Sequence, residues 1–195
     1  KVMTVKVLFG RESGRLLGAQ IVGQDGVDKR MDVLATAIRA GMTGEQLKDL
    51  DLAYAPPYSS AKDPVNMAGF LIDNLAKGRL RQFFLEDLPQ LPQDGSITRL
   101  DTRTPAEYAA GHVDGFCNIP LDELRQRLGE LEKGKPVYVM CQSGLRSYIA
   151  CRILEQHGFT CYNFSGGYRM VEAARLGRCA APEAFPCGQE KAQKV

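Results

Sequence analysis

A short apolar strand that leads directly into a cysteine and then a helix is the feature that most restricts how this chain can fold. The segment KPVYVMCQSGLRSYIA predicts a buried strand over residues 137–140, a turn from Cys141 to Arg146 and a helix over residues 147–157. Further strand candidates lie on both sides of this unit, at residues 97–101, 117–119 and 160–164. Strands that alternate with helices form a mainly parallel sheet with helices on both faces, so an α/β fold is expected here.

Two more helices are expected between these strands. Thr104, followed by Pro105 and Glu107, has the pattern of an N-terminal capping box at the start of one helix. The other is expected over residues 121–131. Both would lie against the predicted parallel sheet.

The first part of the chain has a different pattern. Residues 5–9 and 16–22 alternate apolar and polar side chains around the turn GRESG, which predicts a β-hairpin. The last helix of this part has Asp63 as its N-cap and Pro64 as its first residue. Helices are expected over residues 31–40, 43–50 and 64–78. This part is therefore predicted to be α+β.

A stretch that contains glycine and proline separates the two parts. The sequence GRLRQFFLEDLPQLPQDG lies between two segments of regular periodicity, which predicts a linker. A chain of 195 residues is long enough for two small domains. The predicted organisation is a first domain over residues 1–78, a linker over 79–94, a second domain over 95–178 and a tail over 179–195.

Composition and charge argue against several classes of partner. The formal net charge is only +2 and no basic cluster is present, which disfavours nucleic-acid binding. No apolar stretch approaches the roughly 20 residues that span a bilayer, and the amino end lacks a signal-peptide pattern. Six cysteines without a secretory signal or a CxxC pair, and only two histidines, indicate reduced thiols in the cytoplasm and no metal site.

Cys141 is the strongest candidate for a catalytic group. It lies between a buried strand and a helix, where backbone amides and the helix dipole stabilise an anion. Arg146 adds a positive charge, so the thiolate is favoured and the sulfur becomes nucleophilic. An inert core cysteine is the alternative, but it would need neither a glycine-bearing loop nor an arginine five residues later. The other residues of the predicted anion-binding loop are Gln142, Ser143, Gly144, Leu145 and Ser147.

Residues 95–178 resemble a rhodanese domain. The resemblance rests on the Cys141 loop, on LDTRTPAEYAAGHVDGFCNIP before it and on GFTCYNFSGGYRM after it. It implies a sulfurtransferase in which Cys141 takes up a sulfane sulfur as a persulfide and passes it to a nucleophilic acceptor, without a bound cofactor. The implied partners are small sulfur donors and acceptors: thiosulfate, thiol persulfides, and coenzyme A persulfide or disulfide.

The length of the loop separates this family from its chemical relatives. Phosphatases and arsenate reductases of similar fold place five residues between cysteine and arginine, whereas four lie between Cys141 and Arg146. A smaller ring of amides suits a single sulfur atom better than a tetrahedral oxyanion. Phosphatase and arsenate reductase activities are therefore disfavoured.

Other residues in the resembling segments are assigned supporting roles. Asp101 and Arg103 match the DxR motif of the family and His112 its GH pair. We expect these three to hold loops by hydrogen bonds, the alternative being His112 as a catalytic base. Cys117 is a candidate second thiol that could form a sulfur relay or a disulfide with Cys141, although packing in the core is favoured. Packing is also expected for Cys151 and Cys161, and no role is assigned to Cys179 and Cys187.

Residues 1–78 resemble the carboxyl-terminal dimerisation domain of pyridine nucleotide-disulfide oxidoreductases, in the branch of coenzyme A-disulfide reductase and NADH oxidase. The matching segments are GRLLGAQIVG, DKRMDVLATAI and AYAPPYSSAKDPVNMAGF. The resemblance implies a homodimer through residues 1–78 and a tyrosine that assists the redox cysteine. Tyr54 is the position carried over, with Tyr58 second, and either ring could instead pack at the dimer interface.

The sequence contains neither the GxGxxG turns nor the amino-terminal redox cysteine of such reductases. We therefore expect a truncated dimerisation domain and a rhodanese domain from an enzyme that binds FAD and NAD(P)H only at full length. The predicted function is persulfide and sulfane-sulfur handling in a coenzyme A-disulfide, persulfide or polysulfide reductase. The alternative is a non-catalytic dimerisation and interaction module.

Overall fold

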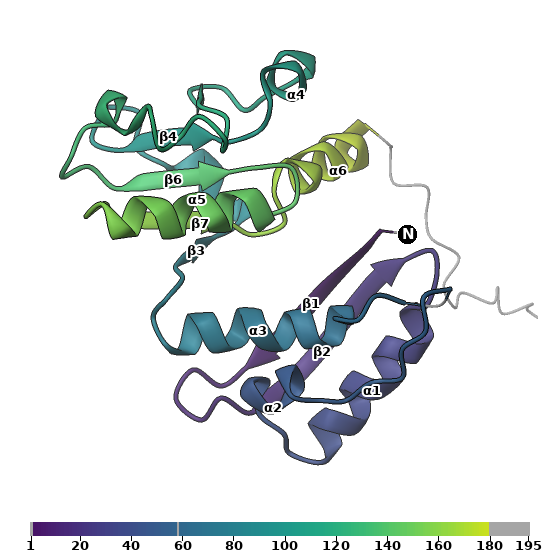
Figure 1. The fold of residues 1–195 in the computed structure, drawn as a ribbon. Helices are drawn as coiled ribbons and strands as arrows, with labels where there is room; N and C mark the ends of the chain where they lie inside the picture. The colour runs from purple at the N-terminus through teal and green to yellow at the C-terminus, as the bar shows by residue number, and fades with distance from the viewer. Residues whose placement is uncertain (1, 58, 180–195) are drawn as a thin grey trace, which may run out of the picture. The chain divides into compact units, whose positions relative to one another are not determined.

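The computed structural model describes residues 2–57 and 59–179, which divide between Arg81 and Gln82 into two compact units (Figure 1). The division falls inside the segment over residues 79–94 that the sequence predicts as a linker. Tyr58, Cys187 and the rest of the predicted tail beyond residue 179 lie outside the described residues.

The first unit packs three helices against an antiparallel hairpin. Strands β1 (Met3–Phe9) and β2 (Leu16–Gly23) form the predicted hairpin. Helices α1 (Val27–Arg39), α2 (Gly44–Lys48) and α3 (Pro64–Ala76) follow. Thr43 and Asp63 close the capping boxes of α2 and α3. The core consists of the buried residues Leu16, Leu34, Ala37, Leu47, Val65 and Ile72.

Gly69 explains how α2 and α3 approach each other so closely. A Cβ atom on Gly69 would lie 2.4 Å from the backbone nitrogen of Lys48 and 2.9 Å from the carbonyl carbon of Leu47. Only a residue without a side chain allows this contact. Gly69 therefore allows α2 and α3 to pack tightly within the α+β unit that the sequence predicts.

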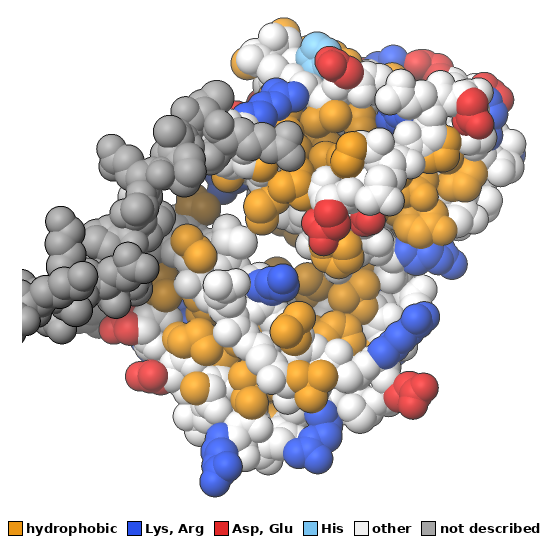
Figure 2. Space-filling model, turned by 180° about the vertical axis from the view of Figure 1, so that it is seen from behind, with side chains coloured by type: hydrophobic (Ala, Val, Ile, Leu, Met, Phe, Trp, Pro, Cys, Tyr) orange, Lys and Arg blue, Asp and Glu red, His pale blue; other side chains and the backbone are white. Residues whose placement is uncertain are grey.

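Apolar side chains also remain exposed on the first unit. Leu8, Leu17 and Val22 of the hairpin and Met67 and Leu71 of α3 are all exposed. Figure 2 shows apolar side chains between charged ones on the face of the first unit turned toward the viewer, in the lower part of the picture. Exposed apolar groups of this kind mark surfaces suited to contact with another protein.

The second unit is an all-parallel sheet of five short strands in the order β3-β7-β6-β4-β5. The strands are β3 (Gln82–Phe83), β4 (Thr98–Asp101), β5 (Cys117–Asn118), β6 (Val137–Met140) and β7 (Cys161–Phe164). The α-helices are α4 (Pro105–Ala110), α5 (Leu145–Gln156) and α6 (Tyr168–Cys179), and the 3-10 helices are η1 (Leu85–Gln90) and η2 (Leu128–Glu130).

Both faces of this sheet are covered. On one face Val137 and Val139 of β6 pack in a cluster with Leu154 of α5. On the other, Met140 packs in a cluster with Val171 of α6. Because successive strand residues point to opposite faces, β6 contributes to both clusters, and all of its residues except the half-buried Tyr138 are buried. The predicted α/β fold with helices on both faces is confirmed.

One local prediction differs from the structure, and part of the predicted linker packs on the second unit. Residues 121–131 form successive turns and η2 instead of one helix, because most of their hydrogen bonds span three residues, as from Leu124 N–H to the Leu121 carbonyl. Gly129 also lowers the helix propensity of this segment. In the predicted linker, Gln82–Phe83 pairs with β7, and Phe83 and Leu91 are buried on the sheet, since these apolar side chains gain more from the core than from solvent.

Candidate active site

Cys141 lies where the order of the strands reverses. From β4 the chain moves to β5 on one side and then returns to β6 on the other side of β4. The loops that follow β4 and β6 therefore diverge, and in open α/β sheets ligands bind in the crevice between such loops. Cys141 immediately follows β6, and Thr102 and Arg103 immediately follow β4.

Two neutral donors point at the sulfur of Cys141. The Gly144 N–H donates to Sγ at 3.1 Å, and the Ser147 hydroxyl donates at 3.2 Å. Cys141 is only 1% exposed and Ser147 is fully buried. The sequence predicted the backbone of Ser147 as part of the loop but not its hydroxyl. Helix α5 begins at Leu145, two residues earlier than expected, and this places Ser147 in the first turn.

The shape of the loop depends on two glycines. Gly144 has a φ of 105°, which side-chain-bearing residues rarely adopt. A Cβ atom on Gly167 would lie 2.5 Å from the Ser143 nitrogen and 2.7 Å from the Cys141 oxygen. The next residue, Tyr168, donates its N–H to that same oxygen at 2.8 Å. The SGGYRM segment therefore supports the loop through its backbone.

Asn163 is a contact of the loop that sequence reasoning missed. This β7 residue is 4% exposed, and its Nδ2 donates to the Gly144 carbonyl at 3.3 Å. Its Oδ1 is buried and has no hydrogen-bond partner among the residues that the structure describes. An asparagine in an otherwise apolar buried strand is the signal that could have identified it, because buried polar groups are costly unless they serve a purpose.

Arg146 forms a bidentate ion pair with Glu107. Both distances are 2.7 Å, from Nη1 to Oε2 and from Nη2 to Oε1. The Arg146 guanidinium, with burial opposing it, holds the pKa of Glu107 at about 2, and Glu107 raises the pKa of Arg146. The sequence placed Arg146 as an anion-binding group and Glu107 only as a helix-capping residue. In the structure the guanidinium is already held by a carboxylate from α4.

Asp101 and Arg103 form a buried ion pair at the carboxyl end of β4, beside the Cys141 loop. Arg103 Nη2 lies 2.8 Å from Asp101 Oδ2, and both residues are almost completely buried. Arg103 also donates to the carbonyls of Glu107 and Gly111 and to the side chain of Gln142. These contacts fix the loops after β4 and β6 relative to each other.

His112 is exposed and lies at the end of α4. Its ring stacks on Tyr108 with centroids 4.1 Å apart, and its Nδ1 lies 3.1 Å from the Tyr108 carbonyl oxygen. It is absent from the lining of the pocket of about 270 Å³ beside the Cys141 loop. That pocket is lined by Arg103, Glu107, Ala110, Gly111, Gln142, Tyr168 and Glu172.

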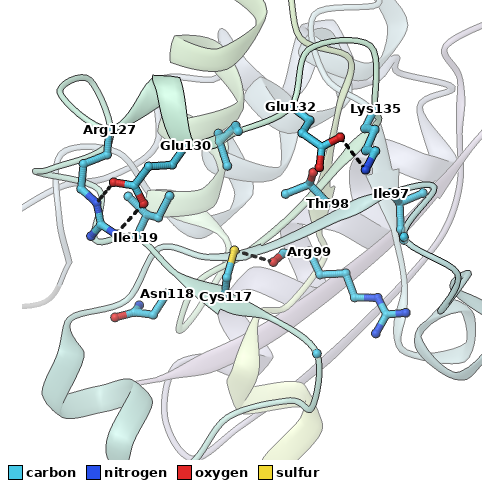
Figure 3. A pocket seen from close by; sticks show the side chains of 13 residues that line it. Ile97, Thr98, Arg99, Cys117, Asn118, Ile119, Arg127, Glu130, Glu132 and Lys135 are labelled. Carbon is cyan, nitrogen blue, oxygen red and sulfur yellow. Dashed lines mark hydrogen bonds and ion pairs between the residues drawn. The ribbon is translucent and has the colours of Figure 1, made fainter.

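Cys117 neither packs in the core nor faces Cys141. It is exposed on the edge strand β5, its thiol donates to the Arg99 carbonyl at 3.2 Å, and partial burial of the sulfur raises its pKa. It lines a separate pocket of about 410 Å³, shown in Figure 3, which no residue of the Cys141 loop lines. The expected core position is wrong because β5 is an edge strand.

The register of the sheet also argues against a bond between Cys117 and Cys141. Cys117 pairs with Leu100, and Leu100 pairs with Val139 on its other side. Two strand spacings correspond to about 10 Å, and Cys141 lies two residues further along β6. A disulfide needs Cα atoms within about 7 Å, so it could not form here without movement of the backbone.

The remaining candidate residues belong to other parts of the two units. Cys151 of α5 and Cys161 of β7 are buried in the same core cluster, and the hydrogen bond with Cys161 raises the pKa of Cys151. Leu145 is exposed at the start of α5. Tyr54 is exposed in the first unit, in the loop between α2 and α3.

Within residues 2–57 and 59–179, no group of three or more His, Cys, Asp or Glu side chains could hold a metal ion, and no helix could cross a bilayer.

Comparisons with known proteins assign both units. Residues 84–174 match the family described as Rhodanese-like domain, and residues 1–64 match the pyridine nucleotide-disulphide oxidoreductase dimerisation domain. The chain therefore joins a rhodanese-like domain to the dimerisation domain of a disulfide oxidoreductase. More particularly, it is similar to proteins of the coenzyme A-disulfide reductase type, as the following relatives show.

Two solved structures share both parts with this chain. Reduced Bacillus anthracis CoADR-RHD is 44% identical with a TM-score of 0.86, covering 90% of this chain and 31% of that protein. An NAD-dependent persulfide reductase from A. fulgidus is 40% identical with a TM-score of 0.75, covering 85% and 29%. A coenzyme A disulfide reductase from Staphylococcus haemolyticus is 47% identical over 66 residues, which are 34% of this chain and 15% of that enzyme. The chain thus spans less than a third of each of these relatives.

Proposed function

We propose that the second unit is a rhodanese-type sulfurtransferase that works through a persulfide on Cys141. The observation that carries this proposal is the sulfur of Cys141 at the carboxyl end of β6, with the Gly144 amide and the Ser147 hydroxyl directed at it. Such donors stabilise negative charge on sulfur, both in the thiolate and in the terminal sulfur of a persulfide. The persulfide-reductase relative supports the same chemistry.

The reaction has two transfer steps. In the first, the Cys141 thiolate attacks the sulfane sulfur of a donor; a new S–S bond forms, and the donor's own bond to that sulfur breaks with its electron pair. With thiosulfate as the donor, the leaving group is sulfite. With a thiol persulfide, the leaving group is the thiolate, which then gains a proton and becomes the thiol. In the second step an acceptor nucleophile takes the outer sulfur and regenerates the Cys141 thiolate.

In the full-length enzyme this transfer would serve an FAD- and NAD(P)H-dependent reductase of coenzyme A disulfide, persulfide or polysulfide. The described residues contain no glycine-rich dinucleotide-binding turn, so flavin and nicotinamide are assigned to the full-length enzyme and no step here passes through them. We place the enzyme in the cytoplasm as a homodimer, supported by the dimerisation-domain match and the exposed apolar side chains of the first unit. Tyr54 is proposed as the residue that assists the redox cysteine.

Transfer of sulfur to cyanide tests the sulfurtransferase proposal. The full chain should convert thiosulfate or glutathione persulfide and cyanide to thiocyanate, and mass spectrometry should show one added sulfur atom on the peptide that contains Cys141. Cys141→Ala should abolish both signals. Cys117→Ser is the matched control, because this thiol lies in a different pocket, and it should retain both.

A non-catalytic dimerisation and interaction module is the competing function. It would be favoured if no donor gave thiocyanate and no persulfide formed on Cys141. Phosphatase or arsenate reductase activity is disfavoured because two neutral donors surround the sulfur while Arg146 is held by Glu107.

A further inference from the structure

Glu107 binds two different groups at the pocket beside the Cys141 loop, which we call the mouth of the Cys141 site. Its Oε2 accepts from the Thr104 N–H at 2.8 Å, which closes the capping box of α4. Its two oxygens also bind both terminal nitrogens of Arg146, 39 residues later in the chain. About a third of each side chain is exposed, so the ion pair stands at the entrance and not in the core.

The charged residues that line the pocket beside the Cys141 loop are paired or negative. Arg103, which lines the pocket beside the loop, is paired with Asp101. Glu107 and Glu172 line the same pocket. Arg175 lies behind the Tyr168 ring and donates to the Tyr168 hydroxyl and the His112 carbonyl. Among the residues that line this pocket, an anionic donor therefore finds two carboxylates, and the one arginine there already has a carboxylate partner.

We propose that Glu107 is a specificity-determining residue that selects against sulfur donors carrying charge on the group next to the sulfane sulfur. Thiosulfate is such a donor, because its sulfite leaving group is anionic and must be stabilised beside Cys141. A thiol persulfide has an uncharged carbon next to its sulfur pair, and its leaving thiolate can take up a proton, so it depends less on a guanidinium than sulfite does. By occupying Arg146, Glu107 withholds from thiosulfate the cation that would stabilise it. This inference rests on the proposed sulfurtransferase function.

The capping box allows the two roles of Glu107 to be separated. Glutamine fills the same position in capping boxes, so Glu107→Gln keeps an acceptor for the Thr104 N–H while removing the negative charge. Thr104→Ala is the matched control, since it removes the other half of the cap and leaves the Glu107–Arg146 ion pair in place. A purely structural role of Glu107 would affect both variants alike.

The test measures kcat/KM for thiosulfate and for glutathione persulfide, each with cyanide as acceptor, in the full chain. For Glu107→Gln the ratio of thiosulfate to persulfide should rise about tenfold or more, which corresponds to about 1.4 kcal/mol. For Thr104→Ala the ratio should stay within twofold of wild type, although unfolding occurs at a lower denaturant concentration. Glu107→Asp, which shortens the reach to Arg146, should shift the ratio in the same direction by less.

An unchanged ratio in folded Glu107→Gln, or an equal rise in Thr104→Ala, would overturn the inference. Should Glu107→Gln fail to fold, Glu107→Asp decides in the same way. Failure of the underlying function looks different: wild type and Cys141→Ala would then be equally inactive with both donors.

Discussion

Ser147→Ala should slow sulfur transfer without unfolding the domain. The Ser147 hydroxyl is fully buried and lies 3.2 Å from Cys141 Sγ, where it donates one of the two hydrogen bonds that the sulfur receives. A hydrogen bond to a charged group contributes about 1.5–3 kcal/mol. If the transition state carries its charge on this sulfur, the loss corresponds to a fall of about 10- to 150-fold in kcat/KM, at about 1.4 kcal/mol per factor of ten.

Stability should change much less than activity. Alanine favours a helix at least as well as serine, and removing the hydroxyl leaves no other protein group without its partner. The assay is thiocyanate formation from a thiol persulfide and cyanide, with urea unfolding measured on the same samples. Ser143→Ala is the matched control, since Ser143 lies in the same loop but is exposed. A loss of less than twofold in Ser147→Ala, or an equal loss in Ser143→Ala, would refute the role of the hydroxyl.

Three further outcomes follow from the contacts. The pKa of Glu107 is lowered from 4.5 to about 2 in the folded state, so the stability that this carboxylate contributes is fully present above about pH 4.5 and is lost as pH falls toward 2. Because the ion pair with Arg146 is partly exposed, this contribution should be at most about 1 kcal/mol. Urea unfolding of wild type and Glu107→Gln across this pH range measures it. Gly167→Ala should destabilise the second unit by about 1–3 kcal/mol and abolish thiocyanate formation, since φ is 65° and the new Cβ would meet the loop backbone; retention of wild-type activity would contradict this. Asp63→Ala should cost about 3–5 kcal/mol in thermal unfolding, because it leaves buried Arg30 without its carboxylate partner, whereas a loss below 1 kcal/mol would be inconsistent with a buried pair.

Local patterns in the sequence predicted the elements that depend on neighbouring residues. Thr43 and Thr104 close capping boxes and Asp63 is the predicted N-cap of α3, and β6 spans residues 137–140 as predicted. Each of these features is decided within a few residues of chain, by side-chain to backbone hydrogen bonds or by an apolar run.

Contacts between distant segments were not predictable in the same way. Glu107 and Arg146 are 39 residues apart, and nothing in either local pattern indicates that the two meet. Asn163 and Gly144 meet only because β7 lies beside β6. The position of Cys117 depended on β5 being the last strand of the sheet, a property of strand order and not of the residues around it.

The groups around Cys141 show the same difference between local and distant contacts. The groups that touch the sulfur, the Gly144 amide and the Ser147 hydroxyl, come from the same loop and helix as the cysteine and carry no net charge. The charged groups are paired with each other, Asp101 with Arg103 and Glu107 with Arg146, and of these four only Arg146 comes from the loop and helix of Cys141. Stabilisation of the sulfur anion can therefore be retained while the paired charges change, since the residues whose dipoles face the sulfur are not the residues that form the ion pairs. On this argument, exchanges at the mouth alter which donor is accepted, and exchanges within the loop alter whether any donor reacts.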